Sequence, residues 1–137
     1  MIEDKELRDL FKVECSEHLQ VLENGLLRLE KEPGDKATLE EVFREAHSLK
    51  GAARMVGVTD VETIGHKFED ILGSAKSGKT VLTSDVIDRL YKGLDSIRKL
   101  VNEAVTGEQA GMNVSEVLSQ IARRAAEALE RKALVKP

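Results

Sequence analysis

The chain is poor in aromatic residues and cysteine, and it has no long apolar run. Aromatics make up 3% of the 137 residues, and tryptophan is absent. Cys15 is the single cysteine, which excludes an intramolecular disulfide. No segment approaches the ~18 apolar residues of a membrane span, and the charged start lacks the apolar stretch of a signal peptide. We therefore expect a cytoplasmic protein of a reducing compartment.

Motifs for nucleotide chemistry are missing as well. The sequence has no phosphate-binding glycine loop and no recognisable kinase motif, so we do not expect it to bind ATP productively by itself. A formal net charge of -4 argues against nucleic acid as the main partner. The length of 137 residues fits one domain.

What the sequence does contain favours an all-α fold. Charged residues make up 34% of the chain, and apolar residues recur at helical spacing in five segments. In the first segment the apolar stripe consists of Leu7, Leu10, Phe11, Leu19, Leu22, Leu26 and Leu29. The five predicted helices span about Glu3–Glu30, Leu39–Val56, Asp60–Lys76, Asp85–Val105 and Val114–Lys132.

The helix ends and the connections predict the topology. Three helices have capping pairs at their starts, Thr38 with Glu41, Thr59 with Glu62 and Asn113 with Glu116. Because short connections join long helices, we expect the first four to form an up-down antiparallel four-helix bundle. We place this bundle at residues 1–106. Residues 107–137 are expected to hold a linker and an additional C-terminal helix, which packs on the bundle or leads to a further domain.

The second predicted helix carries a histidine in an unusual setting. His47 lies at the edge of the apolar stripe, where a side chain reaches solvent. Lys50 and Gly51 follow one turn later, and Arg44 and Arg54 share the same flank. A glycine inside a helix costs roughly 1 kcal/mol against alanine, and the close approach of another molecule would explain it. This flank is therefore a candidate anion site.

The third predicted helix offers complementary groups. His66 and Glu69 lie one turn apart, and Glu69 and His47 both fall roughly 15–18 Å from the turn between the two helices. The spacing therefore allows Glu69 and His66 to stand beside His47. A carboxylate that accepts a ring N–H fixes the imidazole tautomer and stabilises positive charge on the ring. Lys50 and His66 could balance phosphoryl oxygens.

Taken from the residues alone, ordinary interpretations stay open. His47 could be a surface histidine, the cations could form a solvated face, and Glu69 could simply pair with a lysine. A metal-binding bundle is a further alternative, since Glu14 and His18 lie one turn apart, but the sequence has no matched pair of Glu-x-x-His motifs.

A family resemblance separates these alternatives. The segment Phe43–Gly57, with Ile64–Leu72 on the next helix, resembles the phosphorylation motif of histidine phosphotransfer (HPt) domains, above all those of CheA-type chemotaxis kinases. The pattern is His-x-Leu-Lys-Gly followed by His-x-x-Glu. The resemblance implies that His47 is the phosphoacceptor and that Glu69 sets its tautomer. It also implies that Lys50 and His66 supply phosphoryl electrostatics and that Gly51 gives steric access.

The resemblance also implies partners. A histidine kinase ATP-binding domain would phosphorylate the histidine, and an aspartate of a response-regulator receiver domain would accept the phosphoryl group. ATP and Mg²⁺ are expected on those partners, with no cofactor, metal, nucleic acid or membrane bound by this chain. Met1 directly before the first helix suggests that the domain opens its parent protein. A receiver-binding adaptor that accepts no phosphate and a purely structural bundle are the remaining alternatives.

Overall fold

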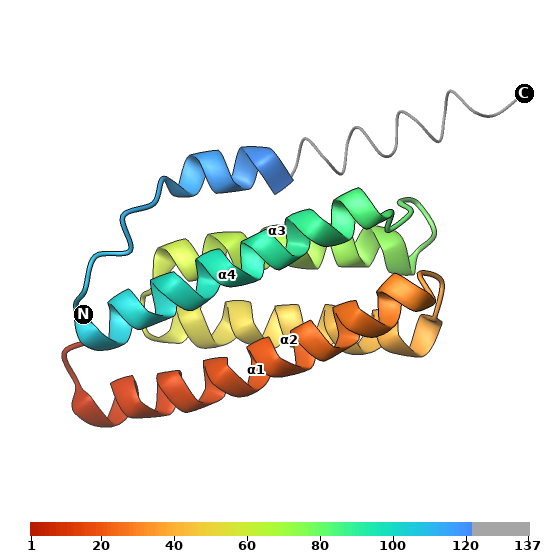
Figure 1. Ribbon diagram of the computed structural model, residues 1–137. Helices are drawn as coiled ribbons and strands as arrows, with labels where there is room; N and C mark the ends of the chain where they lie inside the picture. The colour runs from red at the N-terminus through yellow and green to blue at the C-terminus, as the bar shows by residue number, and fades with distance from the viewer. Residues whose placement is uncertain (122–137) are drawn as a thin grey trace, which may run out of the picture.

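Four long helices make up most of the computed structural model, which describes residues 1–121. Each helix runs antiparallel to the one before it (Figure 1). Neighbours in sequence pack on one another and α4 packs back on α1, so the helices form a closed ring around one core. The predicted all-α, up-down bundle is confirmed. The helices are α1 (Lys5–Lys31), α2 (Lys36–Met55), α3 (Thr59–Lys76) and α4 (Ser84–Thr106).

A further helical segment covers residues 114–121, where the additional C-terminal helix was predicted. Its Ile121 is 3% exposed and belongs to the core. A Cβ placed on Gly93 of α4 would stand 2.6 Å from Cε1 of Phe68 and 3.0 Å from Cδ1 of Ile121. Because Gly93 has no side chain, Phe68 of α3 and Ile121 of this segment can both pack closely against α4. The rest of the predicted fifth helix, to Lys132, lies outside the described residues.

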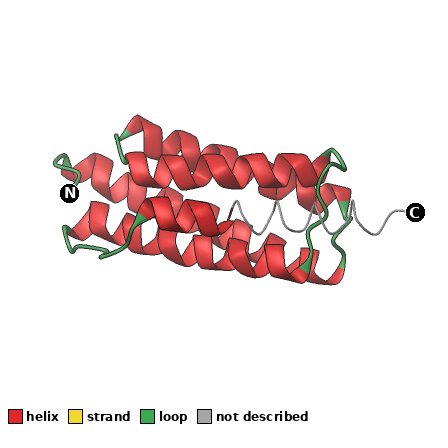
Figure 2. Ribbon diagram, turned by 90° about the horizontal axis from the view of Figure 1, so that it is seen from above, coloured by secondary structure: helices red, strands yellow, loops and turns green. Residues whose placement is uncertain are grey.

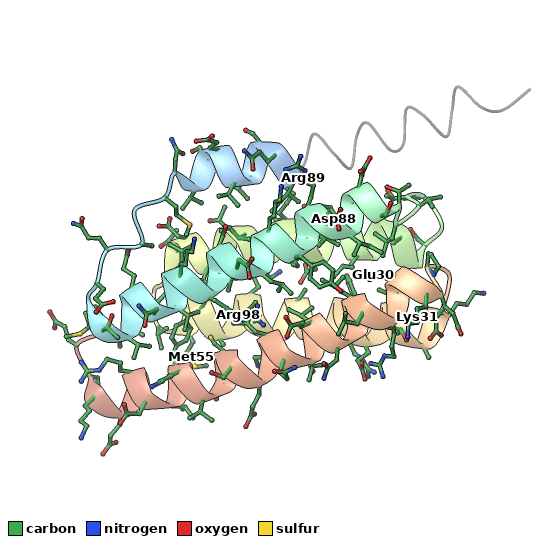
Figure 3. The ribbon with its side chains drawn as sticks, viewed as in Figure 1. Glu30, Lys31, Met55, Asp88, Arg89 and Arg98 are labelled. Carbon is green, nitrogen blue, oxygen red and sulfur yellow. The ribbon has the colours of Figure 1, made fainter. Side chains whose placement is uncertain are left out.

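The helices lie along a common axis, with the loops gathered at the two ends of the bundle (Figure 2). Their inner faces carry the predicted apolar stripes, and Phe68 and Leu22 are among the large side chains that are fully buried. Charged residues tie the outer edges together. Arg98 on α4, labelled in Figure 3, places Nη2 3.4 Å from Oε2 of Glu23 on α1. None of the helices within residues 1–121 has the length and apolar composition that crossing a membrane requires.

Two details of the first helix differ from the sequence prediction. Leu7 and Leu10 were expected in the apolar stripe but are 43% and 52% exposed. The helix also begins later than expected, at Lys5, because the side chain of Asp4 accepts a hydrogen bond from the backbone N–H of Leu7. Because Leu7 and Leu10 are exposed, the first turns of α1 carry apolar side chains in contact with solvent.

The predicted caps of α2 and α3 are also misplaced. α2 starts at Lys36 with Asp35 as its N-cap, and Thr38 lies inside the helix, where its hydroxyl donates to Oδ2 of Asp35. α3 has Val58 as its N-cap, so Thr59 is its first residue. The third predicted cap is present, since the side chain of Asn113 accepts from the backbone N–H of Glu116 at 3.1 Å. Shifts of this size leave the register of the helix faces unchanged.

Candidate functional site

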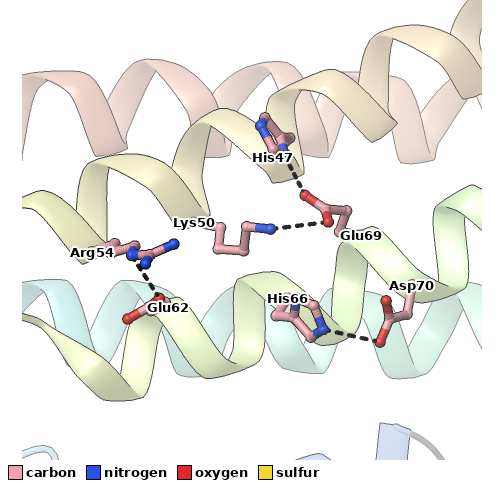
Figure 4. A network of polar contacts seen from close by, with 7 residues as sticks. All are labelled: His47, Lys50, Arg54, Glu62, His66, Glu69 and Asp70. Carbon is pink, nitrogen blue, oxygen red and sulfur yellow. Dashed lines mark hydrogen bonds and ion pairs between the residues drawn. The ribbon is translucent and has the colours of Figure 1, made fainter.

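One carboxylate joins α2 and α3 through two cationic or basic side chains. Oε2 of Glu69 lies 2.5 Å from Nδ1 of His47, and Oε1 lies 3.0 Å from Nζ of Lys50 (Figure 4). Each carboxylate oxygen of Glu69 thus has its own partner on α2. The contact that the sequence predicts between Glu69 and His47 is present in the structure.

This contact is one rung of a regular ladder between α2 and α3. Successive rungs are three or four residues apart on each helix, as antiparallel packing along one edge requires. The two outer rungs are ion pairs of opposite polarity, with the acid on α2 at one end and on α3 at the other. The register of the two helices is therefore specified from both ends. The rungs are Glu40–Lys76, Phe43–Gly73, His47–Glu69, Lys50–Gly65 and Arg54–Glu62.

At the rung next to His47, Gly65 lets α3 come close to the backbone of α2. A Cβ placed on Gly65 would stand 3.4 Å from the Cα of Lys50. Gly65 was not among the predicted site residues, although, like Gly51, it is a glycine inside a helix. A glycine inside a helix costs about 1 kcal/mol, and here the packing of α3 on α2 explains it. Gly65 sets the spacing across which Glu69 reaches His47.

The environment of Glu69 keeps its carboxyl ionised. Burial raises the pKa of Glu69, but the hydrogen bonds and positive charges of Lys50 and His47 outweigh that effect, and its pKa lies below the ordinary value. An ionised carboxylate can only accept hydrogen bonds. Nδ1 of His47 must therefore carry the proton that is donated to Glu69. In a neutral ring, Nε2 then holds the free lone pair.

The histidine is open to approach from solvent. The side chain of His47 is 67% exposed, while its partner Glu69 is only 15% exposed. Gly51, one turn further along α2, is exposed, and a Cβ placed there would meet nothing within 4 Å. The ring of His47 thus lies at the surface, while the carboxylate that orients it is mostly buried. This arrangement suits a nucleophile that must be reached by a macromolecule.

His66 lies elsewhere than expected. It was predicted beside His47, but its Nε2 is 3.6 Å from Oδ2 of Asp70 on the same helix, and Figure 4 shows its ring directed toward that residue. Among the described residues, His66 has no polar contact with His47. It does line an open groove of about 450 Å³ next to Lys50. Asp70 was not predicted as the partner of His66, although residues four apart on a helix commonly pair.

A second imidazole–carboxylate pair lies between α1 and α2. Nδ1 of His18 is 2.6 Å from Oε2 of Glu45, and both side chains are about three-quarters buried. This pair was not predicted, because it depends on how the two helices are rotated. Within residues 1–121, no group of three or more His, Cys, Asp or Glu side chains is arranged to hold a metal ion. Glu14 and His18, the pair noted for metal binding, form no such group.

Comparisons with known proteins agree on one kind of domain. A family model described as "Hpt domain" matches residues 6–106. The chemotaxis protein CheA of Bacillus subtilis is 35% identical over 113 residues, which are 82% of this chain. The solution structure of a CheA histidine phosphotransfer domain, 33% identical, superposes with a TM-score of 0.80 and covers 88% of this chain and 92% of that one.

A third relative is similar in fold alone. The phosphorylated P1 domain of CheA3 from R. sphaeroides, solved in complex with CheY6, is 23% identical with a TM-score of 0.79, covering 91% of this chain and 99% of that one. The curated relatives are much longer proteins. This chain spans only 17% of the B. subtilis protein.

Proposed function

The chain belongs to the Hpt domain family, and we propose that it carries a phosphoryl group on His47 from a kinase to a response regulator. The donor is the ATP-binding domain of a histidine kinase of the CheA type, and the acceptor is an aspartate of a receiver domain. The observation that carries this proposal is the 2.5 Å contact between Nδ1 of His47 and Glu69. It leaves Nε2 as the nucleophile on an exposed edge of the bundle.

The first step forms a bond between Nε2 of His47 and the γ-phosphorus of ATP and breaks the bond from that phosphorus to the bridging oxygen, which leaves on ADP. The ring now carries positive charge, and the ionised carboxylate of Glu69 stabilises it through the Nδ1–H that it already accepts. In the second step a carboxylate oxygen of the acceptor attacks phosphorus and the N–P bond breaks. The ring returns to its neutral tautomer, with the Nδ1 proton held throughout.

Two neighbours of His47 have supporting roles in this proposal. Lys50 holds Oε1 of Glu69 and so keeps Oε2 directed at the ring; its ammonium is also near enough to the site to oppose phosphoryl charge. Gly51 leaves the surface next to His47 free for a partner. His66, held by Asp70, contributes to phosphoryl electrostatics only from the neighbouring groove.

The extent and setting of the domain belong to the same proposal. We take residues 1–106 as the phosphotransfer bundle and 107–137 as linker and fifth helix, in keeping with a family match that ends at residue 106. The bundle works in the cytoplasm, as part of a two-component pathway with a chemotaxis-type output. ATP and Mg²⁺ are bound by the partner domains, and this chain binds no cofactor of its own.

Site mapping tests the proposal directly. The chain is incubated with a CheA-type kinase domain and γ-labelled ATP, and the phosphorylated residue is located by mass spectrometry. We expect acid-labile phosphate on His47 alone, none on His47→Gln, and wild-type labelling of the matched control His18→Gln. In His66→Asn the label should still lie on His47, at a reduced rate. Substantial acid-labile phosphate on His47→Gln would contradict the proposal.

A further inference from the structure

Arg54 occupies the outermost rung of the α2–α3 ladder on the side of Lys50. It follows His47 by two helical turns, ~10 Å along α2 and on nearly the same side of the helix. Its side chain is 79% exposed, and its Nε is 3.9 Å from Oε2 of Glu62, beyond hydrogen-bond distance. The guanidinium is therefore held near the site by charge but keeps its donors available to a partner.

The surroundings of Arg54 differ from those of the other cation of the site. Lys50 is 19% exposed and already bonded to Glu69, whereas Arg54 forms the rim of the groove shared with Glu62, Thr63 and His66. Figure 4 shows Arg54 and Lys50 on successive turns of α2, with Glu69 next to Lys50. Of the two, Arg54 is the cation that a docking protein would meet.

A partner that reacts at His47 must cover Arg54. Specific interfaces bury about 800 Å² per partner, which corresponds to a disc of roughly 16 Å radius. A footprint centred on His47 therefore reaches well past a residue ~10 Å away. An exposed arginine inside such a footprint is either paired with an acid of the partner or opposed by its cations.

The chemistry of the two partners distinguishes these cases. A domain that binds ATP already supplies cations to the three phosphates, so it does not require a further arginine from this chain. A domain that accepts the phosphoryl group on a carboxylate, with a divalent cation held by other carboxylates, collects acids around its acceptor. We propose that Arg54 is a specificity-determining residue that pairs with a carboxylate on the rim of the phosphoryl-accepting domain. This inference rests on the proposed function for the identity of that partner.

Binding measurements test the pairing without requiring phosphorylation. The full chain carrying His47→Gln is titrated with receiver domains from the same genome, and the receiver with the highest affinity is used as the probe. We expect Arg54→Ala to weaken its binding about fivefold, Arg54→Glu to weaken it more than tenfold, and the salt dependence of binding to become shallower. Lys92→Glu on exposed α4 makes the same charge change away from the site and should leave binding unchanged.

A second readout separates this inference from the proposed function. On chains with an intact His47, Arg54→Glu should be phosphorylated by the kinase domain at the wild-type rate or faster, and should pass the phosphoryl group to the receiver more slowly. Equal receiver affinity for wild type and Arg54→Glu, no receiver that binds, or an equal loss in both half-reactions would overturn the inference. Loss of phosphorylation in the wild-type chain would instead overturn the proposed function.

Discussion

Gly65 faces Lys50 at close range, since a Cβ on Gly65 would stand 3.4 Å from both the Cα and the Cβ of Lys50. That distance is the lower limit of ordinary van der Waals contact, so a methyl group just fits and a larger side chain does not. Gly65→Ala should remain folded with near wild-type phosphorylation. Gly65→Leu should separate α3 from α2, cost roughly 1–3 kcal/mol and slow phosphorylation of His47. Urea melts and initial rates measure both; a fully active Leu variant would refute the spacing argument.

Glu69 is expected to control reactivity, and the bundle should remain folded without it. Glu69→Ala removes the acceptor of the Nδ1–H of His47, so the ring loses its selected tautomer and the partner of its positive charge. Orienting contacts of this kind are worth ~10²–10⁴ in rate. Glu69→Gln should fall between Ala and wild type, since an amide oxygen still accepts a hydrogen bond. Initial phosphorylation rates are compared with circular dichroism melts, and an Ala variant at the wild-type rate would remove Glu69 from the mechanism.

Gly51 allows stability and function to be separated. A Cβ at this position meets nothing within the chain, and alanine favours a helix over glycine by about 1 kcal/mol. Gly51→Ala should therefore raise the free energy of unfolding, while Gly51→Leu should slow transfer to the receiver because it occupies the partner's space. The check is a urea melt beside a transfer assay. Unchanged transfer with leucine at position 51 would show that partners do not approach there.

The pair of Glu69 with Lys50 and His47 should also appear in the pH dependence of stability. The pKa of Glu69 is lower in the folded protein than in the unfolded chain, so its contribution is fully present above the unfolded value of about 4.3 and is lost as the pH falls through the folded value. The wild type should therefore be more stable than Glu69→Gln at pH 7, and the difference should shrink below pH ~4. Urea midpoints across this range measure it; a difference independent of pH would contradict the ion pair.

Phe68 and His47 should contribute very differently to the free energy of unfolding. Phe68 is fully buried and its ring lies against Gly93, so Phe68→Ala should cost roughly 3–5 kcal/mol. His47 is two-thirds exposed, and His47→Gln should change stability by less than about 1 kcal/mol. Denaturant melts rank the two, and the reverse order would mean that the helix faces are assigned wrongly.

The sequence predicts the helix faces well because burial follows a period of 3.6 residues, but periodicity does not reveal where a neighbouring helix ends. His18 lies level with Glu45, so eight residues earlier Leu10 lies level with Ala53, close to the end of α2 at Met55. Leu7 lies level with Val56, beyond that end. Leu7 therefore has no turn of α2 beside it. Leu10 is exposed for another reason, since it lies about 100° around α1 from Phe11, which is 2% exposed at the same height.

At the site, too, the sequence predicts some contacts and not others. The number of residues from the turn predicts Glu69 at the height of His47, because the two helices are antiparallel. It could not place His66, whose ring has a choice between the groove and Asp70 four residues away. Side-chain contacts between helices, such as His18 with Glu45, depend on rotamers and on helix rotation, which no spacing rule determines.

The reacting pair is also local in the chain, since His47 and Glu69 are separated by only 22 residues. Loop closure costs entropy that grows with the logarithm of loop length, so bringing these two groups together requires only one short helical hairpin. The geometry of the reacting pair therefore depends mainly on α2 and α3. Core substitutions in α1 or α4 are expected to reduce the population of folded molecules while leaving the reactivity of each folded molecule unchanged.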